Sequence, residues 1–342
     1  MTGHPWVSVI ILNWNGGAYV EEAIASVLNQ NYPTIELIVV DNGSTDGSPQ
    51  RIKDRFGSRL CLIENRTNTG FAAGNNTGIR RARSDYIALL NNDAVADTSW
   101  IKELVAVAEA DPRIGMCASK VLDYFQRDII DTAGHLIYRD GLNRGRGRLE
   151  KDDGRYDKVE EVFFPSGAAA LYRKAMLDRI GLFDEDFFAY GEDADLGIRG
   201  RLGGWICVYV PTAVAYHRYS TSTSAYSPMK AFLVERNRMW VALKNFPLSV
   251  LAIGPFYTLK RYLLQAYAVF SRKGAAGKFA SKHSALRLLG ILFKAQGSAL
   301  GKILVMLKKR RQIKKIAHAS PQEIAQWFRD FEISVRELSL KD

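Results

Sequence analysis

Short apolar runs and amphipathic stretches alternate along the N-terminal part of the chain. The apolar runs are rich in β-branched residues and predict buried strands. The stretches between them repeat apolar residues every three or four positions, which is typical of helices. Because continuous apolar strands are buried on both faces, the alternation predicts an α/β fold with a mainly parallel sheet. The predicted strands are residues 7–12, 37–40, 60–63 and 86–90, and the predicted helices are residues 19–29, 48–56, 71–83 and 98–109.

Three of the predicted strands end in compact polar groups. Asn, Asp and Gly end strands in many proteins as turn residues, so one such group alone carries little information. In open α/β sheets, however, ligands bind beyond the carboxyl ends of the strands, so three groups predict one crevice lined with Asp and Asn. Such a crevice suits a nucleoside, and a carboxylate within it suits a hard divalent cation. The groups are Asn13 and Asn15, Asp41 and Asn42, and Asn91, Asn92 and Asp93.

Two common glycine loops that bind nucleotides are missing from the sequence. No G-x-G-x-x-G follows the first strand, and no G-x-x-x-x-G-K-[ST] occurs anywhere. Dinucleotide binding of the Rossmann type and P-loop NTPase chemistry are therefore disfavoured.

A second polar group, at residues 181–196, combines six carboxylates with four aromatic residues. A solvated acidic loop would not usually carry so many aromatic side chains. Asp193 is expected in the first turn of a helix that continues to residue 202, where the helix dipole favours an ionised carboxylate. Two roles fit it from the residues alone: a general base or an N-capping acid. His217 follows a further predicted strand at residues 206–210. A lone histidine is more often structural, but with Asp93 it would suit a metal site.

Taken in order, these segments resemble the motifs of the family 2 inverting glycosyltransferases, which have the GT-A fold. The resemblance covers roughly residues 5–225, and several ordered motifs are more specific than any single one. Within the family the chain is most similar to rhamnosyltransferase-like bacterial enzymes that build surface polysaccharides. The matching segments are residues 9–16, 39–47, 89–93, 167–173, 181–196 and 211–217, and residues 143–147 and 154–157 add to the rhamnosyltransferase likeness.

The resemblance implies a role for each matching residue. The segment 91–93 occupies the position of the family's D-x-D motif but begins with two asparagines, which leaves one carboxylate for Mg²⁺ or Mn²⁺. The implied residues are Asn13, Asp41, Asn91 and Asn92 for the nucleotide, Asp93 and His217 for the metal, Asp193 as the catalytic base, and Glu192 and Gly167 beside the sugar or acceptor.

The implied reaction is an in-line displacement that moves a sugar, rhamnose or another hexose, from a UDP or dTDP donor to a lipid-linked or polysaccharide acceptor. Two alternatives stay open. A sugar nucleotidyltransferase shares the α/β nucleotide crevice, although its glycine- and lysine-rich phosphate loop is missing after Leu12. A nucleotide-sugar-binding scaffold without catalytic activity would use the same residues for binding only.

Charge divides the chain into two parts. The full chain has 47 Lys and Arg residues and 36 Asp and Glu residues, which gives a net charge of +11. Residues 1–229 have a net charge of −5, whereas residues 230–342 have a net charge of +16. From Arg236 to Gln322 there are 18 basic residues and no acidic residue. This asymmetry predicts a catalytic GT-A domain at residues 1–235 and a basic α-helical region at residues 236–342.

The basic region contains two candidate amphipathic helices, at residues 247–270 and 285–307. Lys260 and Arg261 divide the first into apolar runs shorter than the ~20 residues that a spanning helix requires. Cationic and apolar faces of this kind predict an in-plane helix on an anionic membrane surface. Burial of these faces within the protein is the second interpretation, and nucleic-acid binding is disfavoured by the apolar content. The N-terminus lacks a basic segment before an apolar run, so we expect a cytoplasmic protein, peripheral on the inner face of the plasma membrane.

Overall fold

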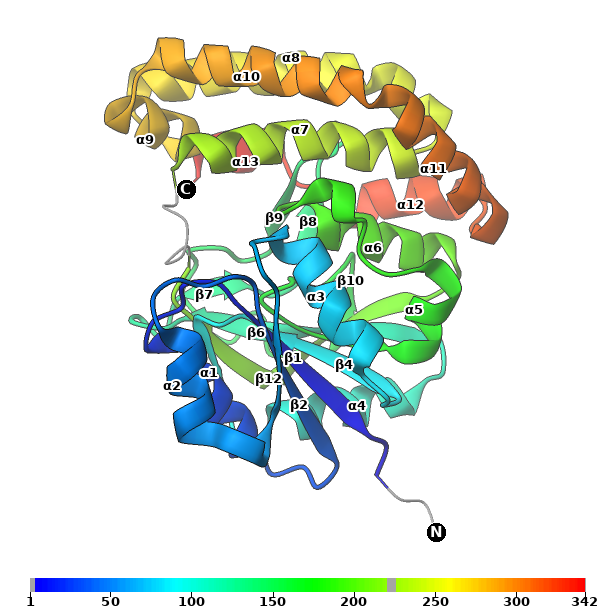
Figure 1. Ribbon diagram of the computed structural model, residues 1–342. Helices are drawn as coiled ribbons and strands as arrows, with labels where there is room; N and C mark the ends of the chain where they lie inside the picture. Colours follow the sequence, from blue (N-terminus) through cyan, green and yellow to red (C-terminus); the bar gives the residue numbers. More distant parts are fainter. Residues whose placement is uncertain (1–3, 220–225, 342) are drawn as a thin grey trace. The chain divides into compact units, whose positions relative to one another are not determined.

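The computed structural model describes residues 4–219 and 226–341, and the chain divides into two compact units (Figure 1). The sheet unit comprises residues 1–135 and 145–222, and the helical unit comprises residues 136–144 and 223–342. The short segment 136–144 therefore belongs to the helical unit, although the chain on both sides of it belongs to the sheet unit. The boundary expected near residue 235 falls inside a helix, α7 (Pro228–Asn245).

A single central sheet of ten strands organises the sheet unit. The strands are β1 (Val7–Asn13), β2 (Ile35–Asp41), β3 (Cys61–Glu64), β4 (Tyr86–Leu90), β5 (Ala94–Ala96), β6 (Ile114–Asp123), β7 (Ile130–Thr132), β10 (Glu160–Val162), β11 (Ala169–Arg173) and β12 (Ile206–His217). Their order is β10-β12-β6-β11-β4-β1-β2-β3, with β5 beside β12 and β7 beside β6. Strands β4, β1, β2 and β3 are parallel, and β11 runs antiparallel between β4 and β6. The mainly parallel α/β sheet expected from the sequence is confirmed.

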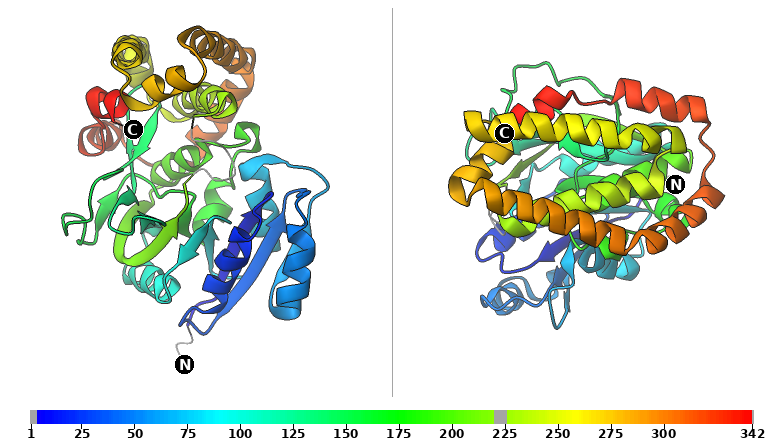
Figure 2. Two further views of the ribbon diagram at one scale, coloured as in Figure 1. Left: turned by 90° about the vertical axis from the view of Figure 1, so that its left-hand side faces the viewer. Right: turned by 90° about the horizontal axis from the view of Figure 1, so that it is seen from above.

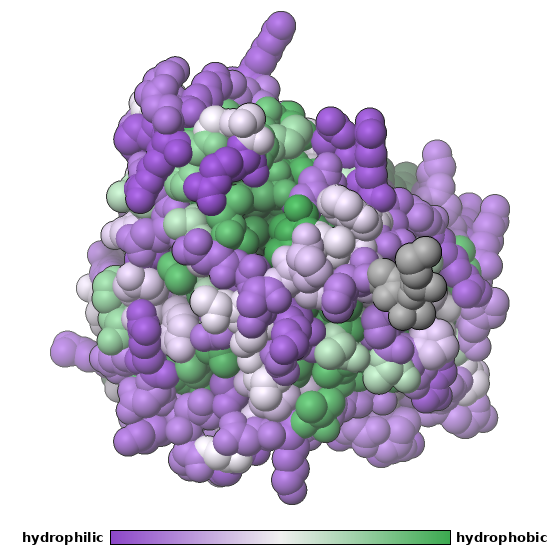
Figure 3. Space-filling view, turned by 90° about the horizontal axis from the view of Figure 1, so that it is seen from below, coloured by the Kyte–Doolittle hydropathy of each residue, from purple (hydrophilic) through white to green (hydrophobic). Residues whose placement is uncertain are grey.

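Helices cover both faces of this sheet, because its strands are apolar on both sides. Val9 of β1 lies in a buried cluster with Ile24 and Trp100, which come from two helices on one face. Ile10 points to the other face, where a Cβ added at Gly78 would lie 2.7 Å from its Cγ2. The helices are α1 (Tyr19–Leu28), α2 (Ser48–Phe56), α3 (Gly70–Arg81), α4 (Trp100–Ala110), α5 (Lys174–Ile180) and α6 (Glu192–Leu202), with 3₁₀ turns η1 (Gly57–Arg59) and η2 (Glu185–Phe187). Figure 3 shows one face of the protein, where hydrophobic residues gather in patches among a hydrophilic majority.

In the part of the chain that the structure describes, the helical unit consists of seven helices and the segment 136–144. Besides α7, its helices are α8 (Leu248–Ser271), α9 (Gly274–Lys282), α10 (Ala285–Gly301), α11 (Ile303–Ile316), α12 (Pro321–Asp330) and α13 (Val335–Leu340). Two short strands, β8 (His135–Ile137) and β9 (Asn143–Gly145), pair at the ends of the inserted segment. Within this unit, α10 packs against α7, and in the view from above in Figure 2 α7 is visible between α8 and α10.

Two details of the basic helices differ from the sequence pattern. The helix expected over residues 285–307 is two helices, which bend by 58° at a break at Lys302, directly after Gly301. Glycine has a low helix propensity, which accounts for a break here. The second detail concerns Pro255. Proline usually interrupts a helix, but α8 continues through Pro255 without a break. Among the described residues no single helix is long and apolar enough to cross a bilayer, whereas the bent pair α10 and α11 meets the length and composition criteria together.

A buried ion network holds the interior of the helical unit. The guanidinium Nε of Arg261 lies 2.6 Å from Asp140 Oδ2, and its Nη2 lies 3.0 Å from Glu235 Oε2. Arg238 pairs with Glu235 and donates to the backbone carbonyl of Asp140 at 3.1 Å. Two carboxylates and two guanidinium groups balance each other, so the network joins the inserted segment to α7 and α8 without a net buried charge.

Candidate active site

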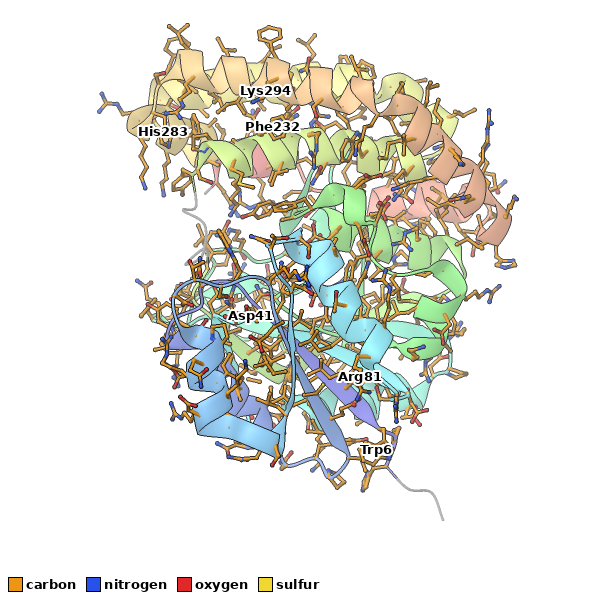
Figure 4. The ribbon with its side chains drawn as sticks, in the orientation of Figure 1. Trp6, Asp41, Arg81, Phe232, His283 and Lys294 are labelled. Atoms are coloured by element: carbon orange, nitrogen blue, oxygen red, sulfur yellow. The ribbon has the colours of Figure 1, made fainter. Side chains whose placement is uncertain are left out.

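The polar residues that end β1, β2 and β4 meet at one edge of the sheet. Strands β1 and β2 are parallel, and Asn13 pairs in register with Asp41 at their carboxyl ends. Asn91 directly follows β4, which is parallel to β1 on its other side. In Figure 4 Asp41 lies at this end of the sheet and Trp6 at the opposite end. The topology therefore brings the three predicted strand-end groups to the same edge.

Hydrogen bonds fix the orientation of these buried side chains. Asn13 Nδ2 donates to Asp41 Oδ1 at 2.8 Å, and Asn92 Nδ2 donates to Asn13 Oδ1 at 3.2 Å. The second carboxylate oxygen of Asp41 accepts from the Ser44 backbone N–H at 3.0 Å. A Cβ added at Gly16 would lie 2.5 Å from Asn13 Oδ1, so the backbone of the first loop approaches this pair closely. The side chains are consequently held in one arrangement before any ligand binds.

The loop after β2 is organised by Asn42, which the sequence analysis placed in the strand-end group with Asp41 without giving it a role of its own. Its Oδ1 accepts from the Thr69 backbone N–H at 3.2 Å and from Asn65 Nδ2 at 3.0 Å. Its Nδ2 donates to the carbonyl oxygen of Gly70 at 3.2 Å. Asn42 therefore joins the end of β2 to the start of α3 and supports the loop that carries Asp41.

Asp93 and His217 form a buried pair. His217 Nε2 lies 3.2 Å from Asp93 Oδ1, and Asn91 Nδ2 lies 3.4 Å from the same nitrogen. The other ring nitrogen, Nδ1, lies 2.7 Å from Oδ2 of Asp131, a residue that the sequence analysis missed. Burial alone lowers the pKa of His217, but the carboxylates of Asp93 and Asp131 outweigh it and raise the pKa to about 10. No local signal singles out Asp131, because it lies 86 residues from His217.

Asp193 stands half-buried in the first turn of α6, as the sequence predicts. The helix begins after Gly191, whose φ of 87° is a conformation that favours glycine. Asp193 Oδ1 accepts from the Ala194 backbone N–H at 2.8 Å, and its Oδ2 accepts from the Gly167 backbone N–H at 3.4 Å. The structure thus brings together Gly167, Glu192 and Asp193, which the sequence placed in two separate motifs.

The two acids of this pair differ in environment. Glu192 is buried, and burial together with the neighbouring charge of Asp193 raises its pKa well above the usual range. Such an environment favours the neutral carboxyl of Glu192 and leaves Asp193 as the candidate proton acceptor.

A set of buried polar groups, not identified from the sequence as site residues, lies close to these acids. The charges of Asp193 and Glu192 add to burial in raising the pKa of Tyr172. His135 stacks on Phe164 with ring centroids 5.0 Å apart, and burial lowers its pKa while the charges of Asp193 and Asp131 oppose that shift. His135 is therefore near both the candidate base and the carboxylate behind His217.

The segment before α6 is attached to the start of α3. The carbonyl oxygen of Phe188 accepts from the Ala72 backbone N–H at 3.2 Å. Gly70 has a φ of 87°, and an added Cβ would lie 2.5 Å from the Phe188 carbonyl oxygen, so only glycine fits this contact. These contacts connect the loop that follows β3 to the loop that precedes α6.

Comparison with known proteins agrees with this arrangement. Residues 8–181 match the model of Glycosyl transferase family 2, about half of the chain. An N-acetylglucosaminyl-diphospho-decaprenol L-rhamnosyltransferase of Mycobacterium tuberculosis is 26% identical over 263 residues, which cover 68% of this chain and 85% of that protein. An uncharacterized glycosyltransferase of Rickettsia prowazekii is 30% identical over 200 residues, which cover 56% of this chain and 57% of that protein.

Solved structures show the same fold at low identity. A mannosyltransferase of Pyrobaculum calidifontis, solved with GDP-Man and Mn²⁺, is 18% identical with a TM-score of 0.52, and the match covers 92% of this chain and 86% of that one. GalNAc-T7, solved with UDP, GalNAc and Mn²⁺, is 17% identical with a TM-score of 0.58 over 71% of this chain and 48% of that one. With the family match and the GT-A arrangement of its sheet, the chain belongs to glycosyltransferase family 2 and is a glycosyltransferase.

Proposed function

We propose that this protein transfers a sugar with inversion from a nucleoside diphosphate donor to a lipid-linked or polysaccharide acceptor. The observation that carries the proposal is the presence in one unit of a fixed Asn13–Asp41 pair, a buried Asp93–His217 pair and a half-buried Asp193. The mycobacterial relative, whose name states a diphospho-decaprenol acceptor, supports a lipid-linked acceptor and rhamnose as the sugar.

In this proposal the edge formed by β1 and β2 binds the donor nucleotide. Asp41 and Asn13 accept and donate hydrogen bonds from fixed positions, which suits a pyrimidine base, and Asn91 and Asn92 line the same edge. UDP and dTDP are the donors that we expect. Because the side chains are already oriented, binding does not require them to reorganise.

The Asp93–His217 pair has the chemistry of a metal site. The contact between Asp131 and Nδ1 orients the ring so that Nε2 faces Asp93, as is usual for a histidine that ligates a metal. The raised pKa of His217 favours an imidazolium that donates to both carboxylates, and a divalent cation at Nε2 would replace that proton. Among the described residues no cluster of three or more potential ligands occurs, so the donor phosphates and water would complete the coordination of Mg²⁺ or Mn²⁺. When bound, the ion supplies positive charge that stabilises the leaving diphosphate.

Asp193 is the proposed general base. Its Oδ2 would take the proton from an acceptor hydroxyl while that oxygen attacks the anomeric carbon. The N–H of Gly167 holds this oxygen at 3.4 Å, a long contact that leaves it able to accept a proton. Glu192, kept neutral by burial, would contribute shape and a hydrogen-bond donor beside the sugar or acceptor.

Calorimetric titration with UDP, dTDP and GDP, each with and without Mn²⁺, tests the donor site. We expect one pyrimidine nucleotide to bind in a Mn²⁺-dependent manner, and Asp93→Ala to weaken that binding at least tenfold. Asp128→Ala is the matched control, because Asp128 is an exposed carboxylate of the same unit whose nearest cation, Lys151, lies 3.6 Å away. Absence of binding by all three nucleotides would overturn the donor-site assignment. Binding that is equal with and without Mn²⁺ would overturn only the metal site.

A further inference from the structure

Helix α8 has a buried face and an exposed apolar face. Its inner face carries Val250, Arg261 and Ala268, which are buried in the helical unit. The opposite face repeats large hydrophobic residues every three or four positions, the spacing of one helical stripe. Over the fifteen residues involved this stripe is about 21 Å long. Its exposed members are Phe256, Leu259, Leu263, Tyr267 and Phe270.

Helix α10 and the start of α11 carry a second stripe of the same kind. Gly290 and Gly297 fall on it, and a Cβ added at either glycine would meet no atom within 4 Å. The stripe therefore borders open space along the length of α10. Seen from above in Figure 2, α7 is visible between α8 and α10, and Gln296 Nε2 of α10 donates to the hydroxyl of Tyr262 on α8 at 2.9 Å. The exposed members are Leu286, Leu289, Phe293, Leu300 and Leu304.

We call these two stripes, defined by the ten residues above, the outward face. Among the described residues, 15 of the 21 exposed large hydrophobic side chains belong to the helical unit. Single exposed hydrophobic residues are common on protein surfaces, but contiguous stripes mark a surface that binds something.

The charge around the outward face restricts what can bind there. Lys260, Arg287 and Lys294 are exposed on the same helices, and no acidic residue occurs between Arg236 and Gln322. Lys294 Nζ lies 5.8 Å from the ring centroid of Phe232 on α7, within cation–π distance (Figure 4). A partner for this face must supply apolar contact together with negative charge.

A second copy of the chain does not meet that requirement. In a two-fold dimer the same surface is used twice, so the basic residues of one copy would face those of the other. A nucleic acid would offer the negative charge but little apolar surface. A bilayer that contains anionic lipids offers both. We infer that the outward face of α8 and α10 lies on an anionic lipid bilayer, with its large hydrophobic residues inserted among the headgroups and its lysines and arginines above them.

Vesicle flotation with the full-length protein tests this inference. We expect binding to phosphatidylglycerol–phosphatidylcholine vesicles, weaker binding to pure phosphatidylcholine, and a decrease with added salt. The double variant Phe256→Glu and Phe293→Glu should weaken binding to the anionic vesicles at least tenfold. Phe125→Glu is the matched control, because Phe125 is 73% exposed in the sheet unit and Phe293 is 72% exposed on α10. This control should bind as the unchanged protein does.

Three results would overturn the inference. The first is no binding of the unchanged protein to anionic vesicles. The second is equal loss of binding in Phe125→Glu and the double variant. The third is a dimer in sedimentation that the double variant dissociates, without vesicle binding, which would identify a second copy as the partner. Circular dichroism of each variant shows whether it folds, and nucleotide titration stays independent of this test because Phe256 and Phe293 belong to the helical unit.

Discussion

The two units place their charged and apolar residues in opposite ways. In the sheet unit the strands are apolar on both faces, and the buried polar side chains gather at the strand ends, where Asn13 and Asp41 pair. In the helical unit the ion network of Asp140, Glu235, Arg238 and Arg261 occupies the interior, while large hydrophobic residues point outward. The sheet unit thus follows the pattern of a domain that faces water.

The comparison shows that buried polar residues and the residues proposed to bind a partner are related differently in the two units. In the sheet unit several buried polar side chains lie at the proposed donor edge with their orientation fixed by neighbours, whereas others form buried ion pairs elsewhere, as Asp195 and Arg199 do within α6. Four buried charged residues of the helical unit, Asp140, Glu235, Arg238 and Arg261, pair with each other, which holds segments of the chain in place. The candidate interaction surface of the helical unit is instead formed by its exposed hydrophobic stripes. Three changes sharpen or break this comparison, from the largest expected effect to the smallest.

The first change removes the proposed base of the sheet unit. Asp193→Asn should lower the rate of transfer by about 10²- to 10⁴-fold, because an amide side chain cannot take the proton from the attacking hydroxyl of the acceptor. Nucleotide affinity, measured by calorimetry, should stay within about twofold, because the nucleotide edge is built from other side chains. The rate is measured with dTDP-rhamnose and an N-acetylglucosaminyl-diphospho-polyprenol acceptor.

Asp178→Asn is the control for this change. Asp178 lies on α5 in the same unit, is largely exposed and pairs with Lys174 four residues earlier. Its loss should leave the rate unchanged. Full transfer activity in Asp193→Asn would overturn the assignment of Asp193 as the base, whereas donor binding without any transfer by the unchanged protein would favour a nucleotide-sugar-binding scaffold.

The second change breaks the ion network of the helical unit. Asp140→Asn leaves Arg261 buried with one carboxylate partner fewer and should destabilise the helical unit by about 3–5 kcal/mol. Urea unfolding followed by circular dichroism measures the effect. Glu332→Gln removes a partly exposed partner of Arg139 in the same unit and should cost only about 0–1 kcal/mol. Equal effects of both variants would contradict the structural importance of the network.

The pH dependence of unfolding provides a second test of the same network. Burial raises the pKa of Asp140 and of Glu235, but the charges of Arg261 and Arg238 outweigh it and lower both below their ordinary values. Because the folded pKa values are depressed, their contribution to stability is present above about pH 4 and is lost as the pH falls further. Unfolding of Asp140→Asn should therefore depend less steeply on pH below pH 4 than unfolding of the unchanged protein.

The third change compares a glycine in a helix of each unit. A Cβ added at Gly197 of α6 would lie 2.2 Å from Phe164 Cβ, so Gly197→Ala should cost about 1–3 kcal/mol. Gly290 of α10 has open space around it, and Gly290→Ala should stabilise by about 0.5–1 kcal/mol through helix propensity. Urea midpoints measure both. Destabilisation by Gly290→Ala would show that the outward face of α10 is covered by protein.

The local sequence pattern was sufficient to predict many strands and helices of the sheet unit. The four predicted strands correspond to β1, β2, β3 and β4, and the helices predicted between and after them correspond to α1, α2, α3 and α4 within a few residues. The period of apolar residues specifies such elements, since it depends only on neighbours along the chain. The strand-end groups and the family resemblance also located the candidate site residues, whose functional roles stay predictions.

The contacts that organise the site and the helical unit depend on residues far apart in the sequence. Asp131 contacts His217 across 86 positions, and Arg261 contacts Asp140 across 121. No periodic pattern connects such positions. The charge asymmetry predicted a separate basic region, but only the tertiary structure assigned residues 136–144 to the helical unit and ended α10 at Gly301. The sequence by itself determined the elements, the family and the strand-end groups, because these rest on local periodicity and ordered motifs. Which charges are buried together, and which apolar face stays exposed, was decided by packing alone, because burial depends on what other parts of the chain cover.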